Sequence, residues 1–118
     1  MGAIQSLQRQ VLSLIGRAVV KSINAASKCQ TVDVELLAGQ GKAGIEHLEP
    51  YGFTSRAKSG AEAVVLFPDG DRCDAVVVSI SDRRYRIKGL KTGEVAFYDD
   101  QGQTVTLTRN GIVIDGGG

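Results

Sequence analysis

Apolar and polar residues follow two different periods along the chain of 118 residues. In residues 3–23, apolar residues recur at spacings of three and four, which is typical of one face of an α-helix. This spacing predicts a helix, packed either against its own domain or against another protein. The predicted helix packing face consists of Ile4, Leu7, Val11 and Leu14, and Ala18 continues its spacing.

Beyond this helix the period changes to two, which predicts short strands separated by turns. In residues 30–39, Val32 and Val34 fall on one face of a predicted strand. The polar residues Thr31, Asp33 and Glu35 fall on the other face. The segment GQGKAG, residues 39–44, follows as a flexible turn.

Two dense apolar runs, residues 61–67 and 74–80, predict paired strands. They are joined by PDGDRC, in which Asp69-Gly70 is a hairpin signal. Residues 83–90 alternate again and predict a further strand. We therefore expect a mainly β chain: an N-terminal helix and linker over 1–28, then a small OB-like antiparallel barrel over 29–91.

The last part of the chain, residues 92–118, contains an internal repeat. Gly93, Gly102 and Gly111 lie nine residues apart, and each precedes a short alternating run. One such unit is too small to bury a core by itself, so it must stack on copies of itself or wrap with other chains. The pattern predicts a solenoid or an intertwined prism. Its apolar pairs are Val95/Phe97, Val105/Leu107 and Ile112/Ile114, and the threonines at 104, 106 and 108 take the other face.

Composition narrows the class of protein. The chain has 42% hydrophobic residues and a formal net charge of +1, which indicates neither a disordered chain nor a strongly basic nucleic-acid binder. Cys29 and Cys73 lie far apart and form no C-x-x-C motif, so neither a zinc site nor a disulfide framework is predicted. The apolar run Val11–Val20 contains Arg17 and is too short to span a bilayer.

The acidic turn holds Asp69, Asp71 and Asp74, which suggests calcium at first sight. An EF-hand loop needs a glycine and a bidentate glutamate at later positions, and neither is in register. A solvated hairpin turn is therefore favoured.

A basic stripe forms the main alternative signal. Arg84, Arg86 and Lys88 share one face of the predicted strand over 83–90, and Tyr85 and Ile87 share the other. Basic strands with aromatic residues on a barrel bind single-stranded nucleic acid in some proteins. The alternatives are an OB-fold nucleic-acid-binding module and a solvated or subunit-facing surface. The second is favoured because the ring faces away from the charges.

No catalytic centre is predicted. His47 is the only histidine, so a catalytic triad or a usual zinc site cannot be composed. Glu46 and Glu49 flank it in a predicted surface loop, and nothing brings two carboxylates together. We therefore expect that the chain is not an enzyme.

Several segments resemble one family in combination. They are YGFTS, GAEAVVLFPDGDR, DRRYR, LKTGEVAFYDDQG and the closing I-x-I-D-G run. Together they resemble the central spike, or baseplate assembly protein V, of Mu-like contractile-tailed phages and their prophage relatives. The resemblance covers about residues 30–118.

The resemblance implies a homotrimer in the tail baseplate of a virion, made in the cytoplasm of the host bacterium. An OB-like domain would dock onto the baseplate hub at the end of the tail tube, and the following strands would wind with two partners into a β-helix. The six apolar repeat residues would then fill the trimer core. The full-length spike is pushed through the host outer membrane when the sheath contracts. No catalytic residue and no nucleic acid are required.

Family members carry a further β-helical segment and an apex domain in which an H-x-H motif holds an iron ion. Here nothing follows Gly118, and His47 matches no part of that motif. We therefore expect no cofactor or metal site in this chain, and the apex that contacts the membrane to be absent from it.

Overall fold

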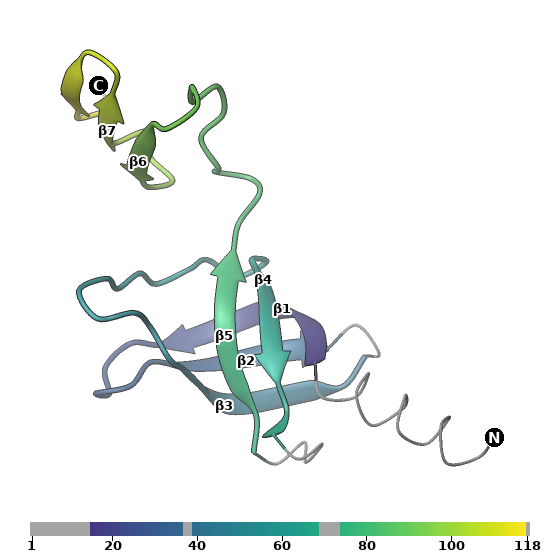
Figure 1. Ribbon diagram of the computed structural model, residues 1–118. Helices are drawn as coiled ribbons and strands as arrows, with labels where there is room; N and C mark the ends of the chain where they lie inside the picture. The colour runs from purple at the N-terminus through teal and green to yellow at the C-terminus, as the bar shows by residue number, and fades with distance from the viewer. Residues whose placement is uncertain (1–14, 37–38, 69–73, 118) are drawn as a thin grey trace. The chain divides into compact units, whose positions relative to one another are not determined.

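The computed structural model describes residues 15–36, 39–68 and 74–117, which are built mainly from β-strands (Figure 1). Contacts group the chain into two compact units, and the boundary between them in the sequence falls between Asp82 and Arg83. The described strands of the first unit are β1 (Ile15–Asn24), β2 (Thr31–Leu36), β3 (Gly41–His47), β4 (Glu62–Leu66) and β5 (Val76–Ser81). Those of the second unit are β6 (Val95–Tyr98), β7 (Thr104–Thr108) and β8 (Gly111–Asp115).

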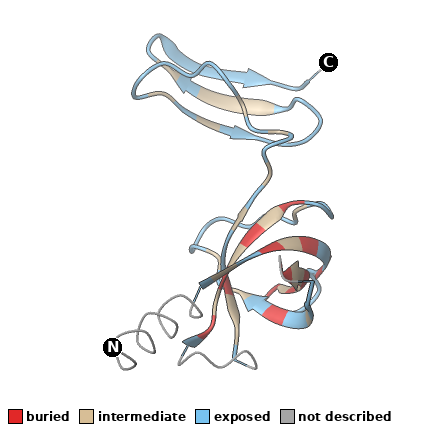
Figure 2. Cartoon of the chain, turned by 90° about the vertical axis from the view of Figure 1, so that its right-hand side faces the viewer, coloured by how far each residue is buried: buried red, intermediate tan, exposed pale blue. Residues whose placement is uncertain are grey.

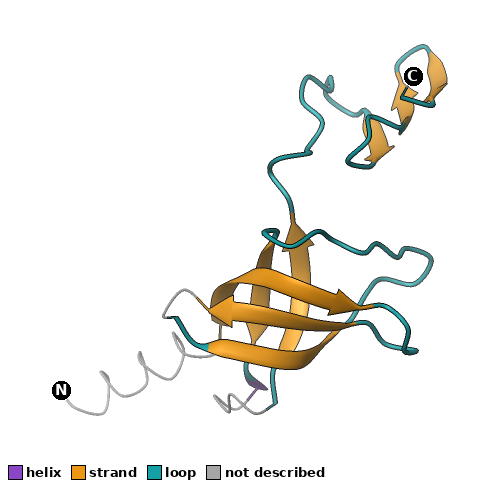
Figure 3. Cartoon of the chain, turned by 180° about the vertical axis from the view of Figure 1, so that it is seen from behind, coloured by secondary structure: helices purple, strands orange, loops and turns teal. Residues whose placement is uncertain are grey.

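The first unit is a closed barrel with the strand order β1-β2-β3-β5-β4, in which β4 pairs back onto β1 (Figure 3). All neighbouring pairs are antiparallel except β3 and β5, which run parallel through Glu46↔Val76 and His47↔Val77. The mainly β fold and the small barrel are confirmed. The barrel is not wholly antiparallel, because this one seam is parallel.

The barrel core follows the alternation of its strands. On β2, Val32 and Val34 are buried, as predicted, and Thr31, Asp33 and Glu35 are only partly covered. Buried residues lie in the barrel and none lies in β6–β8 (Figure 2). The buried apolar residues are Ala18, Val20, Ile23, Val32, Val34, Leu36, Ile45, Ala61, Ala63, Val65, Phe67 and Val77.

The predicted helix over residues 3–23 is wrong from Ile15 onward, because that part is strand β1. Of the residues whose spacing predicted the helix, only Ala18 lies in β1, and β1 also contains a β-bulge. Val20 pairs with Val34 and Ser22 with Asp33, so Lys21 is an extra residue. The buried Val20 and Ile23 are consequently three residues apart, as they would be on a helix. The predicted packing face of Ile4, Leu7, Val11 and Leu14 lies outside the described residues.

Strand β3 replaces most of the turn predicted over residues 39–44. Only Ile45 of this strand is buried, and its alternation is interrupted opposite Asp33 by an irregularity in the β2–β3 register. Gly44 has a φ of 68° at this point. A strand with one buried residue and two glycines carries little signal in its sequence. The paired strands predicted over 61–67 and 74–80 are confirmed as β4 and β5; their predicted Asp69-Gly70 turn lies outside the described residues.

The second unit is a three-stranded antiparallel sheet with the order β6-β7-β8. The repeat glycines Gly93, Gly102 and Gly111 all have positive φ, at 88°, 84° and 130°. Such backbone is unfavourable for residues with a side chain, so the nine-residue glycine spacing marks the turns of this sheet. The sequence repeat is therefore a β-meander within one chain.

Candidate functional site

The six apolar repeat residues lie in two rows across the second unit. Val95 pairs with Leu107, and Leu107 with Ile112. Phe97 pairs with Val105, and Val105 with Ile114. Directly opposed residues share a face of the sheet, and so do residues two apart on one strand. All six therefore occupy one face, which we call the apolar face: Val95, Phe97, Val105, Leu107, Ile112 and Ile114.

The apolar face is largely uncovered in the single chain. The exposed fraction is 50% for Val95, 48% for Phe97 and 41% for Leu107. It rises to 69% for Ile112 and 77% for Ile114 on the edge strand β8. Contiguous exposed apolar residues of this kind are typical of an interaction surface.

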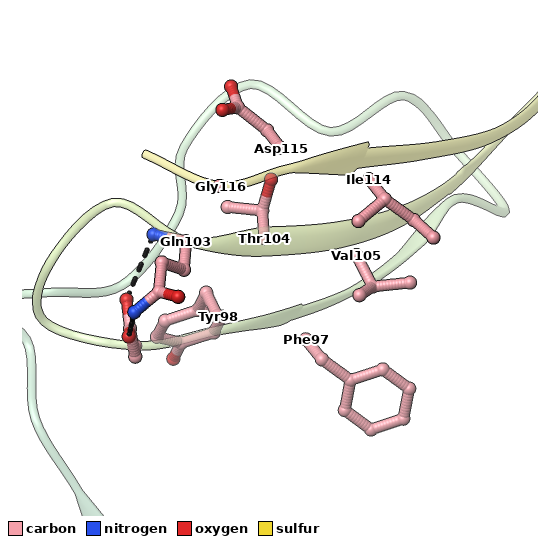
Figure 4. A pocket seen from close by; sticks show the side chains of 9 residues that line it. Phe97, Tyr98, Gln103, Thr104, Val105, Ile114, Asp115 and Gly116 are labelled. Atoms are coloured by element: carbon pink, nitrogen blue, oxygen red, sulfur yellow. Dashed lines mark hydrogen bonds between the residues drawn. The ribbon is translucent and has the colours of Figure 1, made fainter. Parts of the chain in front are cut away.

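One end of the apolar face borders a shallow hollow. Figure 4 shows Phe97, Val105 and Ile114 in one row across the three strands. The hollow is also lined by Tyr98, Asp99, Gln103, Thr104, Asp115 and Gly116. Its apolar side thus belongs to the apolar face, and its polar side to the turn between β6 and β7.

The turns of the meander are held by carboxylates. One oxygen of Glu94 accepts a hydrogen bond from the Lys91 N–H at 2.8 Å, and the other accepts one from the Arg109 N–H at 3.1 Å. The Arg109 guanidinium donates to the Gly93 carbonyl at 2.7 Å. These backbone N–H groups, that of Lys91 first, hold the pKa of Glu94 below its ordinary value of 4.5. The clamp therefore operates with an ionised carboxylate.

Asp99 holds the next turn in the same way. Its Oδ1 accepts hydrogen bonds from the N–H groups of Gln101 and Gln103, each at 2.9 Å. The Gln103 side chain donates to Asp99 Oδ2 at 2.6 Å (Figure 4). The turns of the meander thus satisfy their own backbone groups.

The opposite face of the meander is more polar. Thr104, Thr106 and Thr108 alternate with the apolar residues of β7, as predicted, and all three are partly buried. Thr108 Oγ1 donates to the Gly111 carbonyl at 2.7 Å and accepts from the Asn110 N–H at 3.1 Å. Ala96, Tyr98 and Val113 lie beside these threonines, and Tyr98 and Val113 are exposed. The opposite face is thus mixed, whereas the apolar face is formed by aliphatic and aromatic side chains alone.

The basic stripe is not on a strand. Residues 83–90 form a turn followed by irregular chain, so the predicted strand is wrong. Arg84, Arg86 and Lys88 are nevertheless exposed, and Tyr85 and Ile87 are partly buried. The Arg84 guanidinium lies over the Tyr85 ring, 5.4 Å from its centroid. The ring is thus engaged by an arginine of its own chain.

The candidate acid–base residues are placed separately. Glu46 and His47 are the last two residues of β3, not part of a loop. Glu49 follows in the loop and accepts hydrogen bonds from the Ser55 N–H at 3.0 Å and from the Thr54 hydroxyl at 3.0 and 3.1 Å. Burial raises the pKa of Glu49. The hydrogen bonds, that from the Ser55 N–H first, lower the pKa by more than burial raises it, so the pKa lies below its ordinary value of 4.5. Glu49 is a structural carboxylate.

Within the described parts of the chain, no three histidine, cysteine, aspartate or glutamate residues gather where they could hold a metal ion. Of the acidic turn, Asp69 and Asp71 lie outside the described residues and Asp74 is exposed. Among residues 15–36, 39–68 and 74–117, no helix has the length and apolar character needed to cross a membrane.

One surface feature is not predicted by the sequence pattern. The loop after β3 exposes Leu48, Tyr51 and Phe53. A signal is present in Gly52, because glycine at the third position of a turn is typical of type II. The family resemblance includes this segment, but it does not indicate that the side chains are exposed.

Taken together, the molecule has a small closed β-barrel and a β-meander with one exposed apolar face. These features define a class of protein: a small β-protein with a surface suited to assembly. The family comparison then identifies the chain: residues 17–84 match the family model described as "Bacteriophage Mu Gp45, N-terminal". The chain belongs to this family of Mu-like baseplate spike proteins.

Two curated relatives agree. The chain is 35% identical over 105 residues to the "Baseplate puncturing device gp45" of Escherichia phage Mu, covering 89% of this chain and 53% of that protein. It is 33% identical over 111 residues to the "Mu-like prophage FluMu protein gp45" of Haemophilus influenzae, covering 94% of this chain and 60% of that protein. The chain therefore spans little more than half the length of these relatives.

Proposed function

We propose that this chain is the base of a phage central spike, a structural protein of the tail baseplate that acts as a homotrimer. Three copies pack their apolar faces around a threefold axis, so that Val95, Phe97 and Leu107 meet their symmetry mates in a shared core. The β6–β8 meanders then form the first turns of a trimeric β-helical spike. The proposal is supported by the family membership and by the exposure of the apolar face.

The apolar face is the observation on which this function depends. Full burial of a large aliphatic or aromatic side chain contributes roughly 1.5–3 kcal/mol. Because the six side chains are already about half covered, shielding the rest would contribute roughly 5–9 kcal/mol per chain. This contribution offsets the cost of association and is available to the second unit only in the trimer.

The barrel supplies the attachment in this proposal. Its closed five-stranded arrangement suits an OB-like domain, which docks onto the baseplate hub at the end of the tail tube. The full-length spike pierces the host outer membrane when the sheath contracts, through an apex outside residues 1–118. This role is mechanical, so it needs no catalytic residue and no cofactor in this chain.

The molecular mass in solution tests the assembly. We expect light scattering of the chain at micromolar concentration to give the mass of three copies. A monomer in which residues 92–117 remain folded would contradict the proposal, because an apolar face that is stable in water alone needs no partner.

The alternative is an OB-fold module that binds single-stranded nucleic acid through Arg84, Arg86 and Lys88. Their exposure on a chain that contains a closed barrel is the observation in its favour. Such binding would weaken with salt and with Arg84→Ala and Arg86→Ala, whereas Lys28→Ala on the barrel would serve as the control. We expect no binding to oligonucleotides at low salt, since the Arg84 guanidinium already lies over the Tyr85 ring.

A further inference from the structure

The loop that joins β3 to β4 is drawn in teal in Figure 3. It carries an exposed aromatic tip. Tyr51 is 104% exposed relative to a reference residue, so its ring is left uncovered by its own chain. Leu48 and Phe53 flank it and are 59% and 58% exposed. Large apolar side chains gathered in this way on a loop favour a protein partner.

This tip is held rigidly. The Phe53 N–H donates to the Pro50 carbonyl at 3.2 Å, and Gly52 has a φ of 89°, which together make a type II turn. The Glu49 carboxylate closes the base of the turn on Ser55. Since the loop is already ordered, little conformational entropy is lost when Tyr51 binds a partner.

Two further hydrogen bonds tie the loop to the barrel. The buried Gln30 side chain donates to the Ser55 carbonyl at 3.0 Å, and the Leu48 N–H donates to the Val77 carbonyl at 3.3 Å. Glu49 is the only charged side chain in residues 48–55, and its oxygens are occupied by Thr54 and Ser55. The tip therefore presents an uncharged aromatic ring and one phenol hydroxyl.

A complementary hollow lies at the end of β1 and shares no residue with the tip, although one of its residues, Arg56, belongs to the same loop. It is lined by Ile23, Asn24, Ala25, Ala26 and Arg56. The Arg56 guanidinium donates to the Ile23 carbonyl at 3.0 Å and forms no ion pair with a carboxylate among the described residues. The hollow therefore combines small apolar walls with a positioned cation.

The polar edge of this hollow also has a donor to spare. Asn24 Oδ1 accepts a hydrogen bond from the Ala26 N–H at 3.0 Å, which fixes the turn. The Asn24 amide nitrogen donates to nothing in the described part of the chain. A phenol oxygen above the alanines could accept this hydrogen bond.

We propose that Tyr51 of one copy inserts into the hollow of a second copy. The ring lies against the Arg56 guanidinium in a cation–π contact, with Ala25 and Ala26 beneath it. The phenol oxygen accepts from Asn24. Tip and hollow are different patches, so the contact is head-to-tail and closes into a ring under a threefold rotation. This inference rests on the proposed homotrimer and places a second interface on the barrel.

Photo-crosslinking from the tip tests this contact directly. Tyr51 is replaced by benzoylphenylalanine in the full chain, and isotopically light and heavy proteins are mixed before irradiation. We expect adducts that join a light peptide to a heavy one, with the attachment in residues 23–26 or at Arg56. Adducts elsewhere on the second copy, or only within one copy, would overturn the inference.

Substitutions at the tip measure its contribution to assembly. Tyr51→Ala should raise the dissociation constant of the trimer at least about tenfold, and Arg56→Ala should do the same. Tyr51→Phe keeps the ring and is the matched control, with a smaller effect. Tyr51 is fully exposed, so none of its variants should impair folding. An unchanged dissociation constant in Tyr51→Ala would refute the contact.

The outcomes separate the two proposals. A trimer by light scattering without crosslinks to the hollow removes the barrel contact and leaves the spike trimer intact. A monomer at every concentration removes both. Crosslinks to the hollow in a chain that stays trimeric after Leu107→Asp would support the barrel contact and count against the apolar face as the main interface.

Discussion

Gly16 lets the largest buried side chain of the barrel approach the backbone of β1. A methyl group at this position would lie 3.0 Å from Phe67 Cε2 and 3.5 Å from Leu36 Cδ2. Both neighbours are buried, Phe67 completely. Close packing of this kind leaves no room for an added carbon.

Gly16→Ala should therefore destabilise the barrel by about 1 kcal/mol, through overpacking against Phe67. Thermal unfolding followed by circular dichroism would show a lower midpoint. Gly41→Ala is the matched control, since a methyl group at Gly41 meets nothing within 4 Å. Equal midpoints for the two variants would show that the Phe67 ring moves aside at no cost.

Asp33 of β2 accepts hydrogen bonds from both neighbouring strands, β1 and β3, at the points where their registers shift. Its Oδ2 accepts from the Ser22 hydroxyl at 2.9 Å beside the β1 bulge, and its Oδ1 accepts from the Gly44 N–H at 2.8 Å in β3. These bonds, that from Gly44 first, lower the pKa of Asp33 below its ordinary value of 3.8. The charged form is thus favoured in the folded barrel.

Asp33→Asn should cost about 1 kcal/mol at neutral pH, a value kept small because the carboxylate is open to solvent. The folded-state pKa is lowered, so the stabilisation is complete above the unfolded value of 3.8 and is lost as pH falls through the folded value. Urea unfolding of both proteins at several pH values should show their difference shrinking below pH 3.8. Asp74→Asn is the control, and a difference independent of pH would contradict this role.

At the scale of elements, regular strands could be predicted from sequence and irregular ones could not. In β2 and β4 the alternation Val32/Val34 and Ala63/Val65 is unbroken, and the strands were predicted. In β1 the bulge at Lys21 places the buried Val20 and Ile23 three residues apart, which departs from the period of two. A pattern read along one chain cannot reveal a bulge, because the bulge is defined by the partner strand.

The same reasoning explains the outcome for residues 83–90 and for the candidate site. Residues 83–90 alternate as a strand would, yet no neighbouring strand pairs with them, so they remain irregular. The meander could be predicted in part because its turns are local: Gly93 and Gly102 mark them in the sequence. What the repeat did not reveal is that Leu107 and Ile112 are cross-strand neighbours on one sheet. The Tyr51 tip required the loop geometry.

Leu107→Asp tests the apolar face at its central strand. The substitution places a carboxylate where Val95 and Ile112 flank it in the row, and burying an unpaired charge is strongly unfavourable. We expect the trimer to dissociate into chains with an intact barrel, measured by light scattering and circular dichroism. Thr106→Asp, on the opposite face of the same strand, is the control and should keep more of the trimer. Unchanged mass in Leu107→Asp would contradict the proposed packing.

At the scale of the whole molecule, the two units differ in how they are stabilised. The barrel has its own buried core, whereas no described residue of the second unit is buried in the single chain. Stability that depends on association varies with protein concentration by mass action, and stability from an internal core does not.

Hydrogen exchange should therefore separate the units. On dilution from high micromolar to nanomolar concentration, amides of β6–β8 should lose protection while those of β2 and β4 keep it. Mass spectrometry of peptides from each unit measures both in one sample. Equal, concentration-independent protection of the two units would show that the meander is stable alone.

The meander also restricts how a chain of this kind can change in length during evolution. Each nine-residue unit ends in a glycine turn that reverses the chain, so β6 and β8 run in the same direction and β7 in the other. Inserting one unit would make whatever follows leave the sheet at the opposite end of its strands. Inserting two restores the exit, which means that viable duplications and deletions obey a parity rule.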